Sequence, residues 1–269
     1  MMETLLSYGF LQRALLAGIF IGLACALLGV FLILRKDAMI GHGLAHVTFG
    51  GVALGLFLNV LPLLLALAVA VAAALGIMKL KDRAGLHGDT AIGIFSSAGM
   101  AAGILLVTLS QKFNVDLLGY LFGDILAIDP LEVGLSTGLA AAVLLAIALN
   151  YHQLMYMTFS PESARATGVR TGRLDLLLTV LTAVTVVLGM KVVGLLMVTA
   201  LLVIPAAAGL QAAANFKKAV LVSALVALVS VVGGLAAAVA LDLPASAAIV
   251  ILSFLIFGMT FLFRKRRFF

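Results

Sequence analysis

The chain has 269 residues, of which 64% are hydrophobic and only 10% are Asp, Glu, Lys or Arg, and its formal net charge is +6. A soluble domain of ordinary composition is about a quarter charged, so these few charges cannot cover a globular surface in water. The apolar excess excludes a disordered chain. A single cysteine, Cys25, excludes a disulfide-stabilised scaffold and is expected to be a small packing residue. The sequence therefore predicts an integral membrane protein.

Apolar stretches long enough to cross a bilayer, which takes about 20 residues per helix, follow one another along the chain. The predicted spans lie at about 11–34, 38–58, 61–79, 90–110, 130–150, 174–190, 193–212, 218–240 and 245–263. Only Lys191 and a nearby glycine separate the sixth from the seventh. The prediction is therefore an all-α, polytopic helical bundle of eight or nine spans, with residues 1–269 forming a single transmembrane domain.

The basic residues predict how the chain is oriented, because Lys and Arg collect on the cytoplasmic side of a membrane. With nine spans and an external amino terminus, the cytoplasmic segments hold 14 of the 17 Lys and Arg residues. Arg13, Lys112 and Lys191 are the three that fall outside. This distribution predicts a cytoplasmic carboxyl terminus, and it accounts for the net charge without a nucleic-acid partner.

Glycine and proline positions predict how the spans pack. Small residues four apart, such as Gly51 and Gly55 or Gly99 and Gly103, allow two helix backbones to approach closely in lipid. Pro205 lies inside the seventh predicted span. It is expected to kink that helix or to free a carbonyl group in the preceding turn.

The longest predicted cytoplasmic connection, about 151–173, contains a short helix with recognisable ends. A serine suits the N-cap, a proline the first helical position, a glutamate the positively polarised first turn, and a glycine the stop. The residues assigned to this helix are Ser160, Pro161, Glu162, Ala164 and Gly168. Two roles remain open: docking a cytoplasmic partner, or resting on lipid headgroups.

A pair of histidines opens the second predicted span. His42 and His46 are four residues apart, so a helix presents both imidazoles on one face. Neutral imidazoles are good ligands for zinc, and a histidine inside a membrane span indicates a functional pathway. The alternatives are a hydrogen bond to another helix and a proton relay. Because the pair supplies only two ligands, a metal site needs more from another helix, a second copy or water.

Acidic residues lie in the predicted external segment 111–129. The stretch from Asp116 to Asp124 is too apolar for an ordinary loop and too short to span the membrane. It predicts a re-entrant or surface-lying helix near a pore mouth, where the two carboxylates would attract cations. The alternative is that they are solvated loop charges.

The chain has no phosphate-binding loop of the form Gly-x-x-x-x-Gly-Lys-Ser/Thr, and it has no Ser/His/Asp set or paired carboxylates typical of catalysis. We therefore expect a protein that is not an enzyme and that draws its energy from another protein or from an ion gradient.

Three stretches resemble the membrane permease subunits of bacterial metal-ion ABC importers of the zinc/manganese/iron type. They are residues 35–55 with both histidines, residues 118–124, and residues 191–207 around Pro205. Residues 160–169 occupy the place of that family's coupling helix. The order and spacing of these stretches extend the resemblance over nearly the whole chain.

The resemblance implies a multi-pass permease in the bacterial cytoplasmic (inner) membrane, surrounded by lipid and working as a homodimer or pseudo-dimer. Its expected partners are two ATP-binding cassette subunits, an extracytoplasmic metal-binding protein and a second permease copy. In that family an aspartate commonly stands where this chain has His42, whereas His46 matches the family's histidine. Imidazole suits zinc and carboxylate suits manganese. We therefore expect transported Zn²⁺ and no permanently bound cofactor, with Mn²⁺ or Fe²⁺ import, or a proton-coupled secondary carrier, as alternatives.

Overall fold

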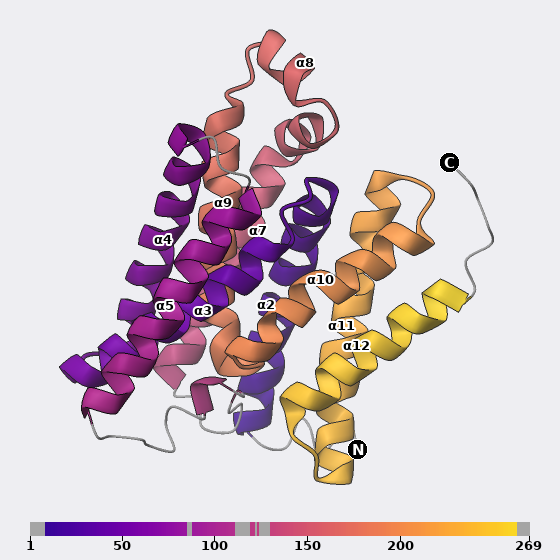
Figure 1. Ribbon diagram of the computed structural model, residues 1–269. Coiled ribbons are helices and arrows are strands. Elements are labelled where there is room, and N and C mark those ends of the chain that lie inside the picture. Colours follow the sequence, from indigo (N-terminus) through magenta and orange to yellow (C-terminus); the bar gives the residue numbers. More distant parts are fainter. Residues whose placement is uncertain (1–8, 85–87, 111–118, 122, 124–129, 263–269) are drawn as a thin grey trace.

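The computed structural model describes residues 9–84, 88–110, 119–121, 123 and 130–262, and among these it contains helices and no strand. The helices are α2 (Gly9–Leu34), α3 (Met39–Leu58), α4 (Pro62–Ala84), α5 (Gly88–Ser110), α7 (Pro130–Phe159), α8 (Pro161–Ala166), α9 (Thr171–Val192), α10 (Leu195–Ala212), α11 (Phe216–Leu241) and α12 (Ala245–Leu262). They form one bundle of roughly aligned long helices, from which the short α8 projects (Figure 1). The predicted all-α, polytopic fold is confirmed.

Among the described residues, eight helices are long and apolar enough to cross a membrane. The α10 helix is apolar but shorter, and in Figure 1 it rises diagonally through the bundle between α9 and α11. The prediction of eight or nine spans rested on the weak break between α9 and α10. That break is a tight turn at Gly194, whose φ of 86° is a left-handed value that glycine adopts without strain.

The prediction that the fifth span ends at about residue 150 was wrong, because α7 continues to Phe159. The rings of Tyr151 and Phe159 pack against Phe216 with centroid distances of 5.8 and 5.5 Å. The extension therefore has apolar partners at the start of α11. Pro161 disfavours a helical backbone at Ser160, the residue before it, and α7 ends at Phe159. Because α7 extends this far, the connection from α7 to α9 is shorter than the predicted loop 151–173.

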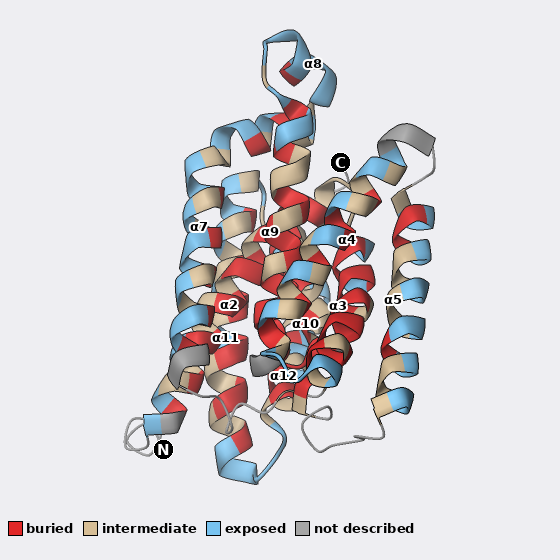
Figure 2. Cartoon of the chain, turned by 90° about the vertical axis from the view of Figure 1, so that its left-hand side faces the viewer, coloured by how far each residue is buried: buried red, intermediate tan, exposed pale blue. Residues whose placement is uncertain are grey.

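The centre of the bundle is formed by α2, α3, α9 and α10, and α5 and α7 lie at its edge with mostly exposed outer faces (Figure 2). Helices α3 and α4 approach closely at the predicted glycines. A Cβ atom at Gly51 would lie 2.7 Å from Ala66 Cα, and one at Gly55 would lie 2.6 Å from Pro62 Cα. Cys25 is fully buried, as a packing residue should be.

The basic residues that the prediction placed inside, so far as the structure describes them, gather at the end of the bundle that carries α8. Figure 1 shows that α2, α4 and α7 end there and that α9 and α11 begin there. These residues are Arg35, Lys36, Lys79, Lys81, Arg83, Arg165, Arg170, Arg173, Lys217 and Lys218. Arg13 in the first turns of α2 and Lys191 near the end of α9 lie toward the other end. The cluster at residues 264–267 and Lys112 lie outside the described residues.

Candidate metal site

The two histidines face each other near the start of α3. Their Nε2 atoms lie 3.2 Å apart, and the ring centroids are 4.7 Å apart with an interplanar angle of 88°. His42 is exposed on the surface of the chain, whereas His46 is half-buried. The prediction that both imidazoles lie on one face of the helix is confirmed. Their four-residue spacing brings two nitrogen donors together inside an apolar span.

Glycines on both sides of His42 explain how a polar side chain sits in such a closely packed helix. A Cβ atom at Gly41 would lie 2.6 Å from Leu202 Cδ2 of α10, and one at Gly43 would collide with Ile92 Cγ2 of α5. Side chains on α10 and α5 therefore fill the space beside α3 that a larger residue would need. The Gly-His-Gly sequence fixes the backbone between two helices and leaves the imidazole on the remaining, open face.

A small cavity of about 20 Å³ adjoins the pair. Its lining residues are His42, Ala45, His46, Phe49, Met100, Leu121 and Leu195. A volume of this size holds about one water-sized particle, so it has room for a bare cation. Apart from the two imidazoles its walls are apolar, which makes the ring nitrogens the dominant donors.

Leu121 belongs to the segment 111–129, so the described part of that segment reaches the histidines. The carboxylates of Asp116 and Asp124 lie outside the described residues. Among the residues that are described, no group of three or more His, Cys, Asp or Glu side chains is placed to hold an ion. Within that part of the chain, the pair therefore offers two nitrogen donors and no third donor of these residue types.

The predicted short helix is present as α8, and its carboxyl-terminal stop is confirmed. Gly168 has a φ of 84° and its N–H donates to the Arg165 carbonyl at 3.0 Å, while the Val169 N–H donates to the Ala164 carbonyl at 2.9 Å. These two bonds form a Schellman motif. The predicted capping by Ser160 was wrong in detail, because its hydroxyl donates to Ser163 Oγ at 2.7 Å and bonds no backbone N–H.

Helix α8 projects beyond the ends of the long helices (Figure 1), and one of its residues is buried against them. Ala164 is fully buried, whereas Pro161, Glu162 and Gly168 are exposed. A single buried alanine leaves most of the surface of α8 accessible. The geometry therefore suits contact with another molecule, and α8 lacks the broad apolar face of a helix that rests on lipid.

Pro205 lies inside α10, as predicted, and the helix continues through it. Because proline has no N–H, the carbonyl of Leu201 loses its partner in the α-helical ladder. Both residues are buried, so this helix carries a weakened point in its middle, close to the centre of the bundle.

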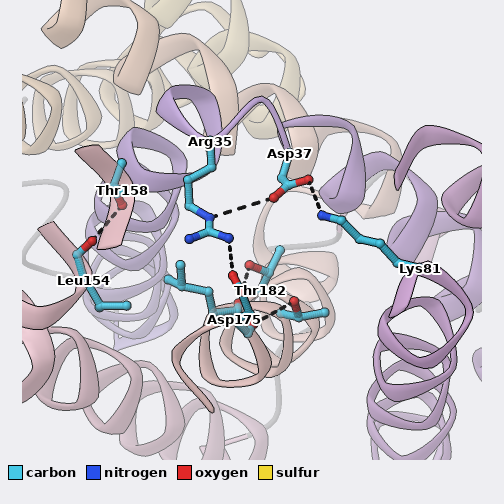
Figure 3. Close-up of polar contacts among 9 residues, drawn as sticks. Arg35, Asp37, Lys81, Leu154, Thr158, Asp175 and Thr182 are labelled. Carbon is cyan, nitrogen blue, oxygen red and sulfur yellow. Dashed lines mark hydrogen bonds and ion pairs between the residues drawn. The ribbon is translucent and has the colours of Figure 1, made fainter. Parts of the chain in front are cut away.

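One group of polar residues was not singled out by the sequence analysis. Arg35, which follows α2, forms an ion pair with Asp175 of α9 and a second one with Asp37, and Asp37 also pairs with Lys81 of α4 (Figure 3). Asp175 could have indicated this group from the sequence, because a carboxylate in the first turns of an apolar span requires a positively charged or hydrogen-bonding partner.

The described geometry is matched by known proteins. The family model for the ABC 3 transport family covers residues 7–264. The chain belongs to the ABC 3 transport family. It is similar to the manganese transport system membrane protein MntC of Halalkalibacterium halodurans, with 31% identity over 265 residues that cover 98% of this chain and 91% of that protein. It is also similar to the high-affinity zinc uptake system membrane protein ZnuB of Haemophilus influenzae, with 35% identity over 261 residues, 97% of this chain and 99% of that protein.

A solved structure, PsaBC from Streptococcus pneumoniae in complex with Fab, is similar to this ABC 3 family chain with a TM-score of 0.88 and 31% identity, covering 99% of this chain and 96% of that one. The resemblance to permease subunits of metal-ion ABC importers is therefore confirmed, and with it a multi-pass protein of the bacterial inner membrane. The named relatives include manganese and zinc systems. Family membership thus establishes a metal-ion permease and leaves the choice of metal to the chemistry of the site.

Proposed function

We propose that this ABC 3 family chain is the permease subunit of an ATP-driven importer, and that Zn²⁺ is the ion it carries. The observation that supports this most directly is the imidazole pair, whose Nε2 atoms lie 3.2 Å apart beside a cavity of about 20 Å³ within a membrane-spanning helix. A bare divalent ion does not enter hydrocarbon, so a pathway must offer ligands that replace its water. His42 and His46 are those ligands.

The preference for zinc rests on the chemistry of the donors. Both side chains offer nitrogen, which suits zinc, whereas a carboxylate in one position would favour manganese. Two ligands are too few for a closed structural zinc site, which has four. A transport site must also release its ion, so the imidazoles bind Zn²⁺ only transiently in this proposal.

The missing ligands come, in this proposal, from a second copy of the chain. His42 is exposed on the chain surface, so a twofold axis next to it would bring four imidazoles to one channel. Water and the carboxylates of Asp116 and Asp124 at the external entrance complete the pathway. The end that carries α8 and the basic residues faces the cytoplasm, the carboxyl terminus lies inside and the amino terminus outside.

The energy comes from partner subunits. Two ATP-binding cassette subunits dock on the exposed surface of α8, mainly at Pro161 and Glu162, and an extracytoplasmic binding protein delivers the ion. Closure of the ATPases changes the packing of the long helices, and the weakened turn before Pro205 accommodates that change. The permease itself carries out no hydrolysis.

The test is uptake of radiolabelled Zn²⁺, Mn²⁺ and Fe²⁺ by proteoliposomes that contain the permease, the ATPase and the binding protein. Zn²⁺ uptake should require ATP and should fall to background when both His42 and His46 are replaced by alanine. His152→Ala is the matched control, because His152 is an exposed histidine whose ring stacks edge-on against Tyr151 and takes no part in the pair. ATP-dependent Zn²⁺ uptake by the double variant at the control rate would refute the ligand assignment.

A proton-coupled carrier is the second candidate, because a proton taken up by one imidazole can pass along the hydrogen bond to the other, whose Nε2 lies 3.2 Å away. The same proteoliposomes distinguish a proton-coupled carrier from an ATP-driven importer. If an imposed proton gradient drives Zn²⁺ uptake without ATPase subunits, the chain is a secondary carrier.

A further inference from the structure

Three ion pairs join four segments at the α8 end of the bundle (Figure 3). Arg35 Nη2 donates to Asp175 Oδ1, Arg35 Nε lies 3.8 Å from Asp37 Oδ2, and Lys81 Nζ lies 3.3 Å from Asp37 Oδ1. We call these four residues the charge network. It connects the end of α2, the start of α3, the end of α4 and the first turns of α9.

The inner part of the charge network is largely shielded from solvent. The side chains of Arg35 and Asp37 are 16% and 21% exposed, and that of Asp175 is 32% exposed, whereas Lys81 is 44% exposed. Charges in such surroundings are stable when paired and costly when one partner is removed. The Arg35–Asp175 pair is therefore the part of the charge network that most strongly fixes α9 against the junction of α2 and α3.

Helix α8 is tied to the same place by a hydrogen bond. Arg165 Nε of α8 donates to Thr171 Oγ1 at 2.9 Å, and Thr171 is the buried first residue of α9. Asp175 follows one turn later on α9. A displacement of α8 thus acts on the turn of α9 that holds Arg35.

On the other side, the charge network ends at the histidine helix. Asp37 stands just before α3, and its backbone carbonyl accepts the N–H of Ile40 at 3.1 Å in the first turn. His42 comes five residues after Asp37. A change in the position of Asp37 therefore moves the helix start that carries the imidazole pair.

A cavity of about 120 Å³ lies within this arrangement and leaves space for movement. Asp37, Lys81, Arg165 and Asp175 all contribute to its wall. It is large enough and polar enough to contain several water molecules. Ile40 lines this cavity whereas His42 lines the other one, so the two cavities lie on different sides of α3.

We propose that Arg35 and Asp175 are positioning residues, which transmit the position of α8 to the start of α3 and so couple ATP hydrolysis to the histidine site. This proposal rests on the proposed function, since it requires a docked ATPase and a transported ion. Asp37 and Lys81 support the pair from the α3 and α4 sides. The consequence is that the charge network determines how many ions cross per ATP hydrolysed and leaves the affinity of the imidazoles for metal unchanged.

The test measures Zn²⁺ uptake and ATP hydrolysis together in the reconstituted complex. Asp175→Asn keeps the shape of the side chain and removes its charge, and it should lower the ratio of ions transported to ATP hydrolysed roughly tenfold, a typical coupling effect. Basal ATPase activity and Zn²⁺ binding by the permease should stay as in the wild type. Asp175→Glu, which keeps the charge, should retain most of the ratio. Asp89→Asn is the matched control, because Asp89 is an exposed carboxylate in the first turn of α5 near the same end of the bundle.

A double-mutant cycle shows whether the two residues act through each other. Arg35→Gln with Asp175→Asn should reduce the ratio no more than either change alone, because both remove the same pair. If the loss of the ratio in the double variant equals the product of the two single losses, the proposal is overturned. An unchanged ratio in Asp175→Asn would also overturn it. If Asp175→Asn does not assemble, Lys81→Gln at the exposed edge of the charge network replaces it, and a ratio equal to that of Asp89→Asn would equally overturn the proposal. Failure of the proposed function differs from all of these, because the wild type would then transport no metal with ATP.

Discussion

Helices α3 and α5 lie side by side and have similar lengths, but their surroundings differ. Over an 18-residue apolar stretch of each helix, 72% of the stretch in α3 is buried, against 11% of the stretch in α5. Between its two ends, over residues 40–56, α3 has His42 as its one exposed residue, whereas α5 packs along one edge and leaves its outer face free (Figure 2). The difference shows that the histidine pair belongs to the helix with the larger buried share, and that α5 serves mainly as its cover.

The largest expected effect comes from filling the contact between these two helices. Gly50→Leu should lower the melting temperature of the purified permease strongly, because a Cβ atom at Gly50 would already lie 2.6 Å from the Gly99 carbonyl oxygen. Overpacking costs about 1–3 kcal/mol even where side chains can adjust, and here the obstacle is backbone. The control is Gly93→Leu on the open side of α5, where a Cβ atom meets nothing within 4 Å. Equal melting temperatures for the two variants would contradict the contrast between the helices.

A smaller effect is expected on the exposed face of α5. Leu105 is 60% exposed, and if this face meets lipid, Leu105→Lys should destabilise the inserted protein by about 2 kcal/mol, somewhat below the cost at a span centre. The measurement is the membrane-inserted fraction together with thermal stability in nanodiscs. Leu105→Met is the control and should behave as the wild type. A lysine variant of unchanged stability would show that water, and not lipid, meets this face of α5.

The smallest effect is expected for a buried polar group on α3. Thr48 is fully buried, but its hydroxyl donates to the Leu44 carbonyl of its own helix at 2.7 Å. Thr48→Val should therefore change the free energy of unfolding by no more than about 1 kcal/mol. Denaturation in mild detergent measures this, with Thr182→Val as the control, since Thr182 on α9 has the same local bond to Leu178. A much larger loss for Thr48 alone would indicate that its hydroxyl has a role beyond its own helix.

The sequence predicted the spans, the sorting of basic residues and the α8 stop, because each depends on local pattern or on the bilayer itself. The facing of His42 and His46 was predictable for the same reason, since helical spacing alone sets it. The extension of α7 was not, because it depends on Tyr151 and Phe159 packing against Phe216, which lies far along the chain.

The charge network was hidden for a related reason. Arg35 and Asp175 are separated by 140 residues, and only the packing of α2 against α9 brings them together. A sequence pattern indicates the periodicity of an element and where it begins and ends. It does not indicate which distant charged residue will form an ion pair with a given side chain. The lining of the histidine cavity has the same property, because Leu121 and Leu195 enter it from separate segments.

The short turn at Gly194 gives α9 a particular mechanical role. Helix α9 has 22 residues and is therefore a rod about 33 Å long. Asp175 is held near one end of it, and just beyond the other end Leu195 forms part of the wall around the imidazoles. Because only Val193 and Gly194 separate α9 from α10, a rotation of the rod about its own axis cannot be absorbed by a slack connection. A rotation applied at the basic end of the bundle would therefore reach the cavity beside the histidines along α9 as well as through α3. Both routes would change the shape of that cavity together.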